Sequence, residues 1–276
     1  MNNSERIERI LEDAETLANS WRIEGRWADA LTLLNGLHLV ATQQGNTALA
    51  RKWLLIARVL TDQAIFGGFD TRAEREEALN HALSHAEMEG EPSLLGSVWD
   101  AKGFSLHAAY LDGDRRNEPE HEMEFFERGL ALRRQVNRPY EVAESLFHIG
   151  LVYGVVRHDH TQALPYFEDA YRLAQDSGDR VMASYAIRHI AFARYSTGDI
   201  ASACTGLEES LRLREAAHFK PGIALALMAL ASAEAERGDK AKAITMLERA
   251  RNIFEGLGAT QRLELVDQEV TQLIQS

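Results

Sequence analysis

The C-terminal half of the sequence repeats itself at an interval of forty residues, and this periodicity constrains the fold more than any other feature. Four columns of residues share the offset. They are an aspartate (Asp159, Asp199, Asp239), an alanine (Ala163, Ala203, Ala243), a large apolar residue (Phe167, Leu207, Leu247) and a small residue (Ala170, Ser210, Ala250). Agreement at four columns indicates an internal repeat. The chain is therefore expected to stack copies of one structural unit.

The pattern continues towards the N-terminus with small changes of spacing. The stretch FERGLALRRQVNR from Phe126 aligns with FEDAYRLAQDSGD from Phe167. Six copies result, at about 3–45, 46–91, 92–138, 139–179, 180–219 and 220–258, followed by one further segment at 260–275. We expect residues 1–276 to form a single domain.

Each copy has the pattern of two helices. In the fifth copy, apolar residues recur at helical spacing on both sides of the Gly198–Asp199 dipeptide. Glycine favours the left-handed conformation that ends a helix, and aspartate accepts from the free amides that begin the next. The spacing of Ala203, Leu207 and Ser210 places a small, a large and a small residue on one helix face. A single helix pair could not bury both its faces, so the copies must stack.

Composition agrees with a helical, soluble chain and argues against several classes of partner. Only five prolines interrupt a sequence rich in strong helix formers. The excess of 42 acidic over 30 basic residues gives a net charge of −12, which disfavours nucleic acid and anionic membrane surfaces. The single cysteine, Cys204, suits a reducing compartment. There is no apolar run of about 18 residues, so we expect a cytoplasmic protein.

These columns resemble the tetratricopeptide repeat. The forty-residue period, with LAQDSGDRVMA between copies, is similar to the long repeats of kinesin light chains, polarity adaptors and bacterial peptide-sensing regulators. The resemblance implies an all-α fold, a right-handed α-solenoid of about six helix pairs closed by a C-terminal capping helix. It also implies a binding scaffold for a protein or peptide, without an enzymatic role, a metal or a cofactor.

In this family the first helix of each pair lines a concave face, so the resemblance also projects which residues point inwards. The predicted ligand-binding residues are Asp100, His107, Tyr110, His148, Tyr185, Arg188, Phe192 and Tyr195. The sixth copy adds Leu225, Met228, Ser232 and Ala235 to this face. Aromatic side chains with a few oriented polar groups are what a peptide groove needs. The Lys and Asn set with which some co-chaperone repeats clamp a terminal carboxylate is absent, and only Arg188 could serve that purpose.

Two other classes of function stay open at this stage. An enzyme or small-molecule binder would use Asp100, His107 and His148 as acid–base groups on adjacent helices. A structural oligomer would pair through the last helix, where Leu263, Val266, Val270 and Leu273 form an apolar stripe. The simpler role of this stripe is to cover the open end of the sixth copy, and a homodimer through the C-terminal helix is the alternative.

A histidine pair and an insertion give weaker indications of function. His81 and His85 lie one helical turn apart, a spacing that can place two imidazoles on one metal ion, but they lack the glutamate of the metalloprotease motif. We therefore expect them on a solvated helix face. The third copy contains the insertion RRNEPE at 115–120, and a lengthened turn beside a groove can contact a ligand.

Overall fold

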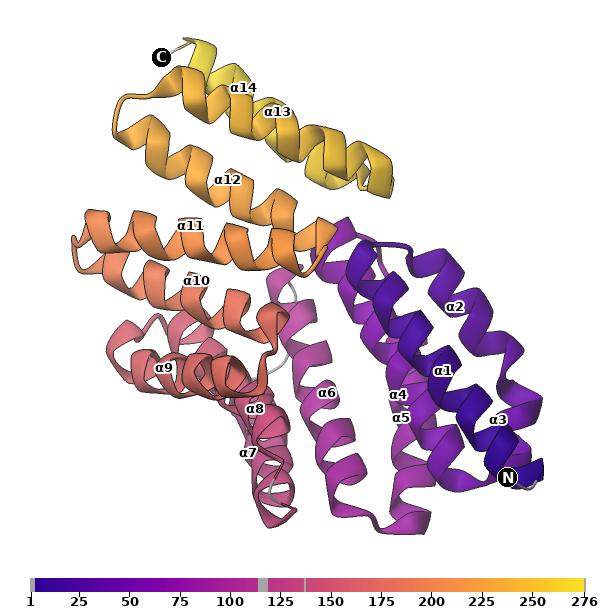
Figure 1. Ribbon diagram of the computed structural model, residues 1–276. Coiled ribbons are helices and arrows are strands. Elements are labelled where there is room, and N and C mark those ends of the chain that lie inside the picture. The colour runs from indigo at the N-terminus through magenta and orange to yellow at the C-terminus, as the bar shows by residue number, and fades with distance from the viewer. Residues whose placement is uncertain (1–2, 114–118, 137, 276) are drawn as a thin grey trace. The chain divides into compact units, whose positions relative to one another are not determined.

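The computed structural model describes residues 3–113, 119–136 and 138–275, and within these ranges the chain is helical and contains no strand (Figure 1). The helices divide into two compact units. Unit 1 comprises residues 1–65 and 69–148, and unit 2 comprises residues 66–68 and 149–276. The all-α class predicted from the sequence is confirmed. A single domain over 1–276 stays a prediction, and each unit is described by itself.

Unit 1 contains the first three copies and the start of the fourth. Its helices are α1 (Asn3–Glu24), α2 (Trp27–Gly36), α3 (His38–Gln44), α4 (Asn46–Asp62), α5 (Arg72–Glu89), α6 (Pro92–Leu111), α7 (Pro119–Gln135) and most of α8 (Pro139–Leu151). The π-helical turn at Gln63–Gly67 begins in unit 1, and its last two residues belong to unit 2. Helices α4 and α5 pack as a pair, as do α6 and α7. The first copy differs from the expected pair, because its second helix breaks between α2 and α3, directly after Gly36. Glycine is a poor residue for a helix interior.

Unit 2 contains the rest of the repeats. After a π-helical turn at Val152–Val156 come α9 (His160–Ser177), α10 (Arg180–Ser196), α11 (Ile200–Ala216), α12 (Lys220–Glu236), α13 (Lys240–Leu257) and α14 (Thr260–Gln275). Consecutive helices from α9 to α14 lie side by side (Figure 1). The helix pairs expected at 180–219 and 220–258 are thus α10–α11 and α12–α13.

The Gly-Asp dipeptide makes the tight turn within these pairs. Gly198 has φ 86° and Gly238 has φ 91°, a left-handed conformation that glycine adopts without a steric penalty. The Asp199 carboxylate accepts from the Ser202 amide at 3.1 Å, and the Asp239 carboxylate accepts from the Lys242 amide at 3.0 Å. Each carboxylate satisfies a free amide at a helix start. The recurring dipeptide is therefore the joint that holds each pair in register.

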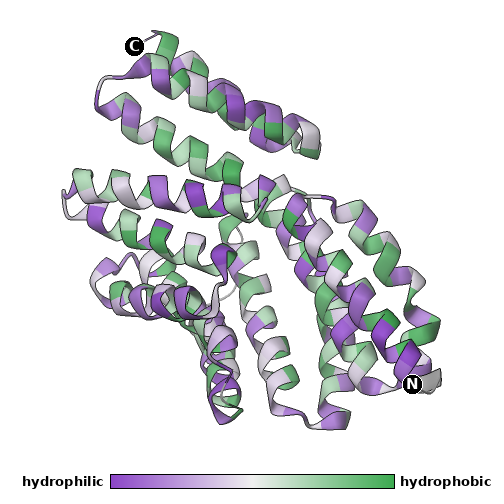
Figure 2. Cartoon of the chain, in the orientation of Figure 1, coloured by the Kyte–Doolittle hydropathy of each residue, from purple (hydrophilic) through white to green (hydrophobic). Residues whose placement is uncertain are grey.

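The repeated apolar columns form the core of unit 2. Ala203 and Ala243 are buried, as are Leu207 and Leu247. Figure 2 shows that α12 is apolar over most of its length, and it packs between α11 and α13. A helix that is apolar on all sides must be covered on all sides. The stack therefore supplies neighbours that a single pair could not.

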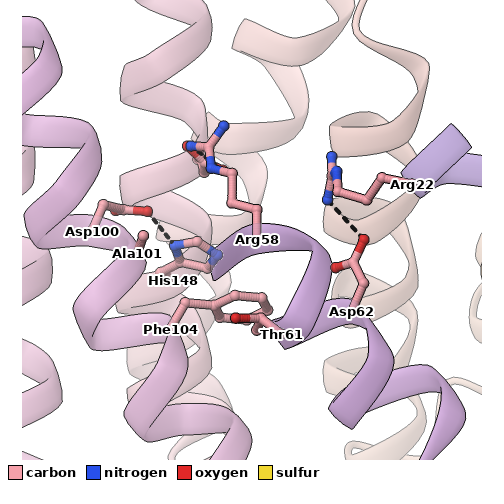
Figure 3. Close-up of a pocket in the computed structure, with 9 residues that line it drawn as sticks. Arg22, Arg58, Thr61, Asp62, Asp100, Ala101, Phe104 and His148 are labelled. Atoms are coloured by element: carbon pink, nitrogen blue, oxygen red, sulfur yellow. Dashed lines mark hydrogen bonds and ion pairs between the residues drawn. The ribbon is translucent and has the colours of Figure 1, made fainter. Parts of the chain in front are cut away.

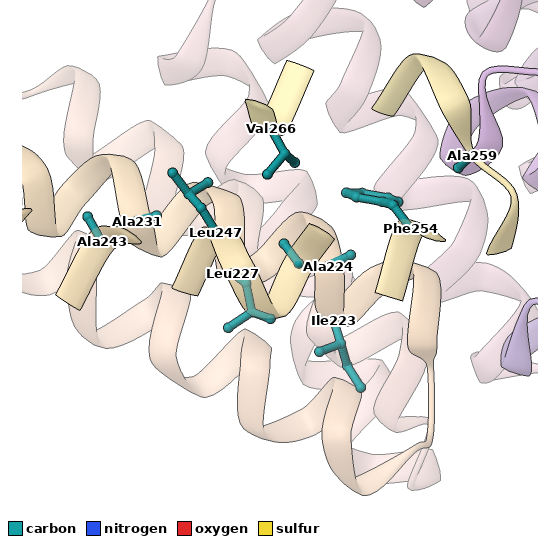
Figure 4. Packing of buried hydrophobic residues seen from close by; sticks show 10 residues of the cluster. Ile223, Ala224, Leu227, Ala231, Ala243, Leu247, Phe254, Ala259 and Val266 are labelled. Atoms are coloured by element: carbon teal, nitrogen blue, oxygen red, sulfur yellow. The ribbon is translucent and has the colours of Figure 1, made fainter. Parts of the chain in front are cut away.

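The C-terminal helix covers the last repeat. Val266 is fully buried and lies with Leu247 and Phe254 in one hydrophobic cluster (Figure 4). Leu263, Val270 and Leu273 pack against the same cluster. The apolar stripe predicted from the sequence is thus used within the chain, which disfavours a self-pairing seam made of these side chains.

Two further sequence expectations concern the insertion in the third copy and the apolar character of the helices. Residues 115–118 of the insertion at 115–120, which was considered for ligand contact, lie outside the described residues. None of the helices in the described ranges combines the length and apolar character needed to span a membrane.

Candidate functional site

A groove in unit 2 has the size of a ligand site. It encloses about 420 Å³, within the range of about 300–1,000 Å³ typical of ligand pockets. Helices α10, α11, α12 and α14 supply its walls. The lining residues are Arg188, Phe192, Tyr195, Leu207, Leu225, Met228, Ala229, Ser232, Ala233, Glu236 and Glu269. Most of this surface is apolar, and its charged groups are a single arginine and two glutamates.

Arg188 is the cation of the groove, and it has no anionic partner among the described residues. The side chain is half-buried, and its guanidinium lies 4.3 Å from the centre of the Phe192 ring. The Nε atom is buried and donates to no described acceptor. Burial, together with the nearby Arg214 guanidinium, lowers the pKa of Arg188 to about 9. A guanidinium in this setting would be stabilised by any anion that entered the groove.

The acidic groups come from two other helices. Tyr195 of α10 donates its hydroxyl hydrogen to the Glu236 carboxylate of α12, and this hydrogen bond raises the pKa of Tyr195. Glu269 of α14 is half-buried and makes no hydrogen bond or ion pair with a described residue. Burial raises the pKa of Glu269. The groove therefore holds an unpaired carboxyl group as well as an unpaired guanidinium.

Unit 1 contains a smaller, charged pocket, shown in Figure 3. His148 of α8 and Asp100 of α6 meet there, with His148 Nδ1 2.8 Å from Asp100 Oδ2. Arg58 contacts Glu144 at 2.9 Å on another side of the pocket. The remaining lining residues are Arg22, Thr61, Asp62, Ala101 and Phe104. The structure thus brings together two of the three residues that the sequence analysis considered for acid–base chemistry.

The volume of this pocket argues against an organic substrate. It measures about 40 Å³, room for a few water molecules and far below a typical ligand pocket. Its charges are also paired across several helices. Arg133 of α7 is fully buried and contacts Asp100 at 3.2 Å and Glu144 at 2.7 Å. This arrangement is that of a buried ion-pair network that ties α4, α6, α7 and α8 together.

Glu144 is the most perturbed carboxyl group of the network. Burial alone would raise the pKa of Glu144, but the cations of Arg58 and Arg133, with His148 beside them, outweigh it and hold this pKa well below its ordinary value. Asp62 shows the opposite balance, because its burial raises the pKa more than Arg22 lowers it. Neighbouring carboxyl groups of one pocket thus differ through the number of cations that each contacts.

The predicted inward residues do not all share one surface. Arg188, Phe192 and Tyr195 line the groove of unit 2, together with the projected Leu225, Met228 and Ser232. Asp100 and His148 belong to the charged pocket of unit 1. The other three predicted residues, His107, Tyr110 and Tyr185, line neither cavity.

Contacts with neighbouring side chains explain where these three residues lie. His107 is buried and lies 3.1 Å from the buried Glu122 carboxylate. Tyr110 is half-buried, with its ring stacked 6.3 Å from that of His107. Tyr185 packs its ring 5.6 Å from Phe219. These side chains contribute to packing in the unit to which each belongs.

Sequence reasoning missed the acidic side of the groove. Glu236 is four residues beyond Ser232 on the same helix, so the helical period could have found it. Glu269 lies on α14, outside the repeat, and no repeat column points to it. The network residues Arg58, Arg133 and Glu144 were missed as well, because each looks like an ordinary charged residue of a helix surface.

The histidine pair weighed as a metal site has other partners. The His81 ring stacks on Trp53 at 4.6 Å, and His85 Nδ1 lies 2.9 Å from the Asn46 side-chain oxygen. No group of three or more metal-ligating side chains is found within the described ranges.

Comparison with known families now identifies the helix pairs. Residues 181–256, which span α10 to α13, match the sequence model of the tetratricopeptide repeat. Residues 181–256 carry tetratricopeptide repeats. No curated protein sequence gives a significant match.

Several solved structures share the fold of this chain over most of its length. NprR, in complex with its cognate peptide NprX, is 12% identical with a TM-score of 0.70, over 100% of this chain and 75% of that one. A Rap protein complexed with Competence and Sporulation Factor is 14% identical with a TM-score of 0.57, over 95% and 80% of the two chains. BtubC from P. vanneervenii is 16% identical with a TM-score of 0.54, over 90% and 92%. Identities this low show a shared fold and do not by themselves assign a ligand.

Proposed function

We propose that this protein is a cytoplasmic, regulatory binding scaffold that holds a peptide segment of a partner in the groove of unit 2. The observation that carries the proposal is the unpaired Arg188 guanidinium in a groove lined mainly by apolar side chains. Apolar walls supply affinity, and a charged group with no partner in the chain supplies orientation. The half-buried Phe192, Leu225 and Met228 would contact the apolar side chains of the peptide.

The proposal also draws on two of the structures with the same fold. NprR is described in complex with a cognate peptide and the Rap protein in complex with Competence and Sporulation Factor. The tetratricopeptide arrangement of helices therefore accommodates such ligands in other chains. This support is an analogy of fold, and the groove residues carry the argument for this chain.

A catalytic role fits the observations less well. The acid–base candidates Asp100 and His148 lie in a pocket of about 40 Å³ and are bound into the ion-pair network. In the larger groove, Tyr195 is hydrogen-bonded to Glu236, and the one serine of the lining, Ser232, donates its hydroxyl hydrogen to the Met228 carbonyl oxygen and not to a base. A small organic ligand remains the rival occupant of the groove, because its volume suits one.

The test starts with a displayed library of random twelve-residue peptides selected on the immobilised full-length chain, followed by titration calorimetry of selected peptides. Ser232→Trp fills the groove from an exposed position on α12 and should abolish binding. Thr245→Trp places the same side chain on an exposed position of α13 outside the groove and should leave binding unchanged. Binding that survives Ser232→Trp, or a library without binders, would contradict the proposal.

A further inference from the structure

Resting on the proposed function, we infer that the groove of unit 2 selects a dipolar peptide segment, one that presents an acidic side chain to Arg188 and a basic side chain to Glu269. The inference names the chemistry of the partner, which neither the fold nor the repeat pattern supplies. It follows from the positions and pairing of the charged groups that line the groove.

The acidic half of the inference follows from Arg188. This guanidinium stacks on Phe192 and has a buried Nε without an acceptor. Most buried polar groups in proteins are hydrogen-bonded, and an anionic side chain that entered the groove would supply an acceptor for this one. The planar fork of arginine matches a carboxylate, to which it can donate two parallel hydrogen bonds. A glutamate or aspartate of the peptide is the simplest group that supplies this match.

The basic half follows from the carboxyl groups across the groove. Glu269 is half-buried on α14 and contacts no cation among the described residues. Glu236 is exposed on α12 and accepts only from Tyr195 among those residues. A lysine or arginine placed between α12 and α14 would meet both carboxyl groups. Its ammonium or guanidinium would offset the free-energy cost of burying the Glu269 carboxylate.

The arrangement of charge excludes simpler ligands. Arg188 forms no ion pair with Glu236 or Glu269, although all three line the same groove. A purely acidic peptide would satisfy Arg188 but approach two carboxyl groups, and a purely basic one would leave Arg188 unpaired. A peptide with one charge of each sign satisfies both ends, and mismatched charges would be rejected.

The experiment is a pair of double-mutant cycles on one peptide selected from the library. In the first cycle, wild type and Arg188→Met are titrated with the peptide and with its version carrying Gln in place of the acidic residue. In the second, wild type and Glu269→Gln are titrated with the peptide and with its version carrying Met in place of the basic residue. Arg194→Met on α10 and Glu264→Gln on α14 alter exposed charges of the same helices and serve as controls.

Each matched cycle should show a coupling of about 10-fold in Kd, the effect of one charge-assisted hydrogen bond. The crossed cycles, in which Arg188→Met meets the basic-residue change or Glu269→Gln meets the acidic-residue change, should show none. Arg188→Lys should retain part of the first coupling because it keeps the charge without the fork.

Two results would overturn the inference. Selected peptides that bind in the groove, and lose binding with Ser232→Trp, but show no coupling in either matched cycle would remove the dipolar assignment while leaving the proposed function intact. Coupling to Arg188 alone would likewise refute it, because Glu269 would then recognise nothing. A library without binders would instead refute the proposed function on which the inference rests.

Discussion

Arg188→Met should make the free protein more stable while it removes ligand recognition. In the free chain the guanidinium is half-buried and unpaired. Replacing a residue that stabilises the fold lowers the free energy of unfolding. A charged residue that serves binding instead lowers the stability of the ligand-free protein, because its charge is buried without a partner. A methionine of similar length removes that buried charge.

The size of the expected gain in stability follows from the lowered pKa of Arg188. Burial and Arg214 lower the pKa of Arg188 to about 9, which sets a ceiling of about 5 kcal/mol, since one pKa unit corresponds to ~1.36 kcal/mol. The lost contact with the Phe192 ring offsets about 0.5–2 kcal/mol, and a methionine sulfur recovers part of it. A net stabilisation of about 1–4 kcal/mol is expected, comparable to replacing buried ionic groups by apolar side chains.

Arg214 provides a matched control in the same unit. It is fully buried, and its pKa is lowered to about 10 by burial. Unlike Arg188, it donates to the Gly222 carbonyl oxygen at 2.5 Å and to Ser184 Oγ at 3.3 Å. Arg214→Met breaks these bonds and should therefore cost about 1–3 kcal/mol.

The assay is urea unfolding followed by far-ultraviolet circular dichroism, with a thermal melt of each variant. Arg194→Met is a second control, since this exposed side chain should change stability by less than about 0.5 kcal/mol. A loss of more than about 1 kcal/mol in Arg188→Met would refute the reasoning, because it would make Arg188 a structural residue like Arg214.

Further predictions concern packing and pH. Gly150→Ala should destabilise by up to about 2 kcal/mol, because the new Cβ would lie 2.6 Å from the buried Phe167 ring and overpacking outweighs the gain in helix propensity. Gly256→Ala, whose Cβ would meet no atom within 4 Å, should stabilise by about 0.5–1 kcal/mol; equal effects of the two changes in urea unfolding would contradict the packing account. Glu144→Gln should cost about 1–3 kcal/mol at pH 7, because it removes the carboxylate from its two arginine partners. The folded-state pKa of Glu144 is depressed, so this advantage of wild type should be complete above about pH 4.5 and shrink as the pH falls below it; a stability difference that stays constant from pH 7 to pH 3 would count against the network.

The repeat joint was predictable because it is local. Gly198 and Asp199 do what their chemistry favours, and the forty-residue period carries the same solution to Gly238 and Asp239. The groove positions of Arg188 and Phe192 follow from the same periodicity, since residues three and four apart share a helix face. What the period cannot supply is the contribution of a helix outside the repeat, and Glu269 was missed for that reason.

Two other differences between the sequence prediction and the structure come from a change of helical register after Leu151 and from ion pairs that bury Asp100 and His148. The π-helical turn at Val152–Val156 alters the helical period after Leu151. Asp100 and His148 were placed on a binding face because the resemblance to the family points these first-helix positions inwards. Their burial is stabilised by Arg133, whose place in the network depends on tertiary packing that a single sequence does not reveal.

The most direct test of the peptide groove is to map where a selected peptide lies. A peptide from the library carrying a benzoylphenylalanine is photo-cross-linked to the full-length chain, and the joined residues are identified by mass spectrometry. The account predicts cross-links to α10, α12 and α14 around Phe192, Met228 and Glu269, and their loss in Ser232→Trp but not in Thr245→Trp. Cross-links confined to unit 1, or unchanged in Ser232→Trp, would show that the groove of unit 2 is not the binding site.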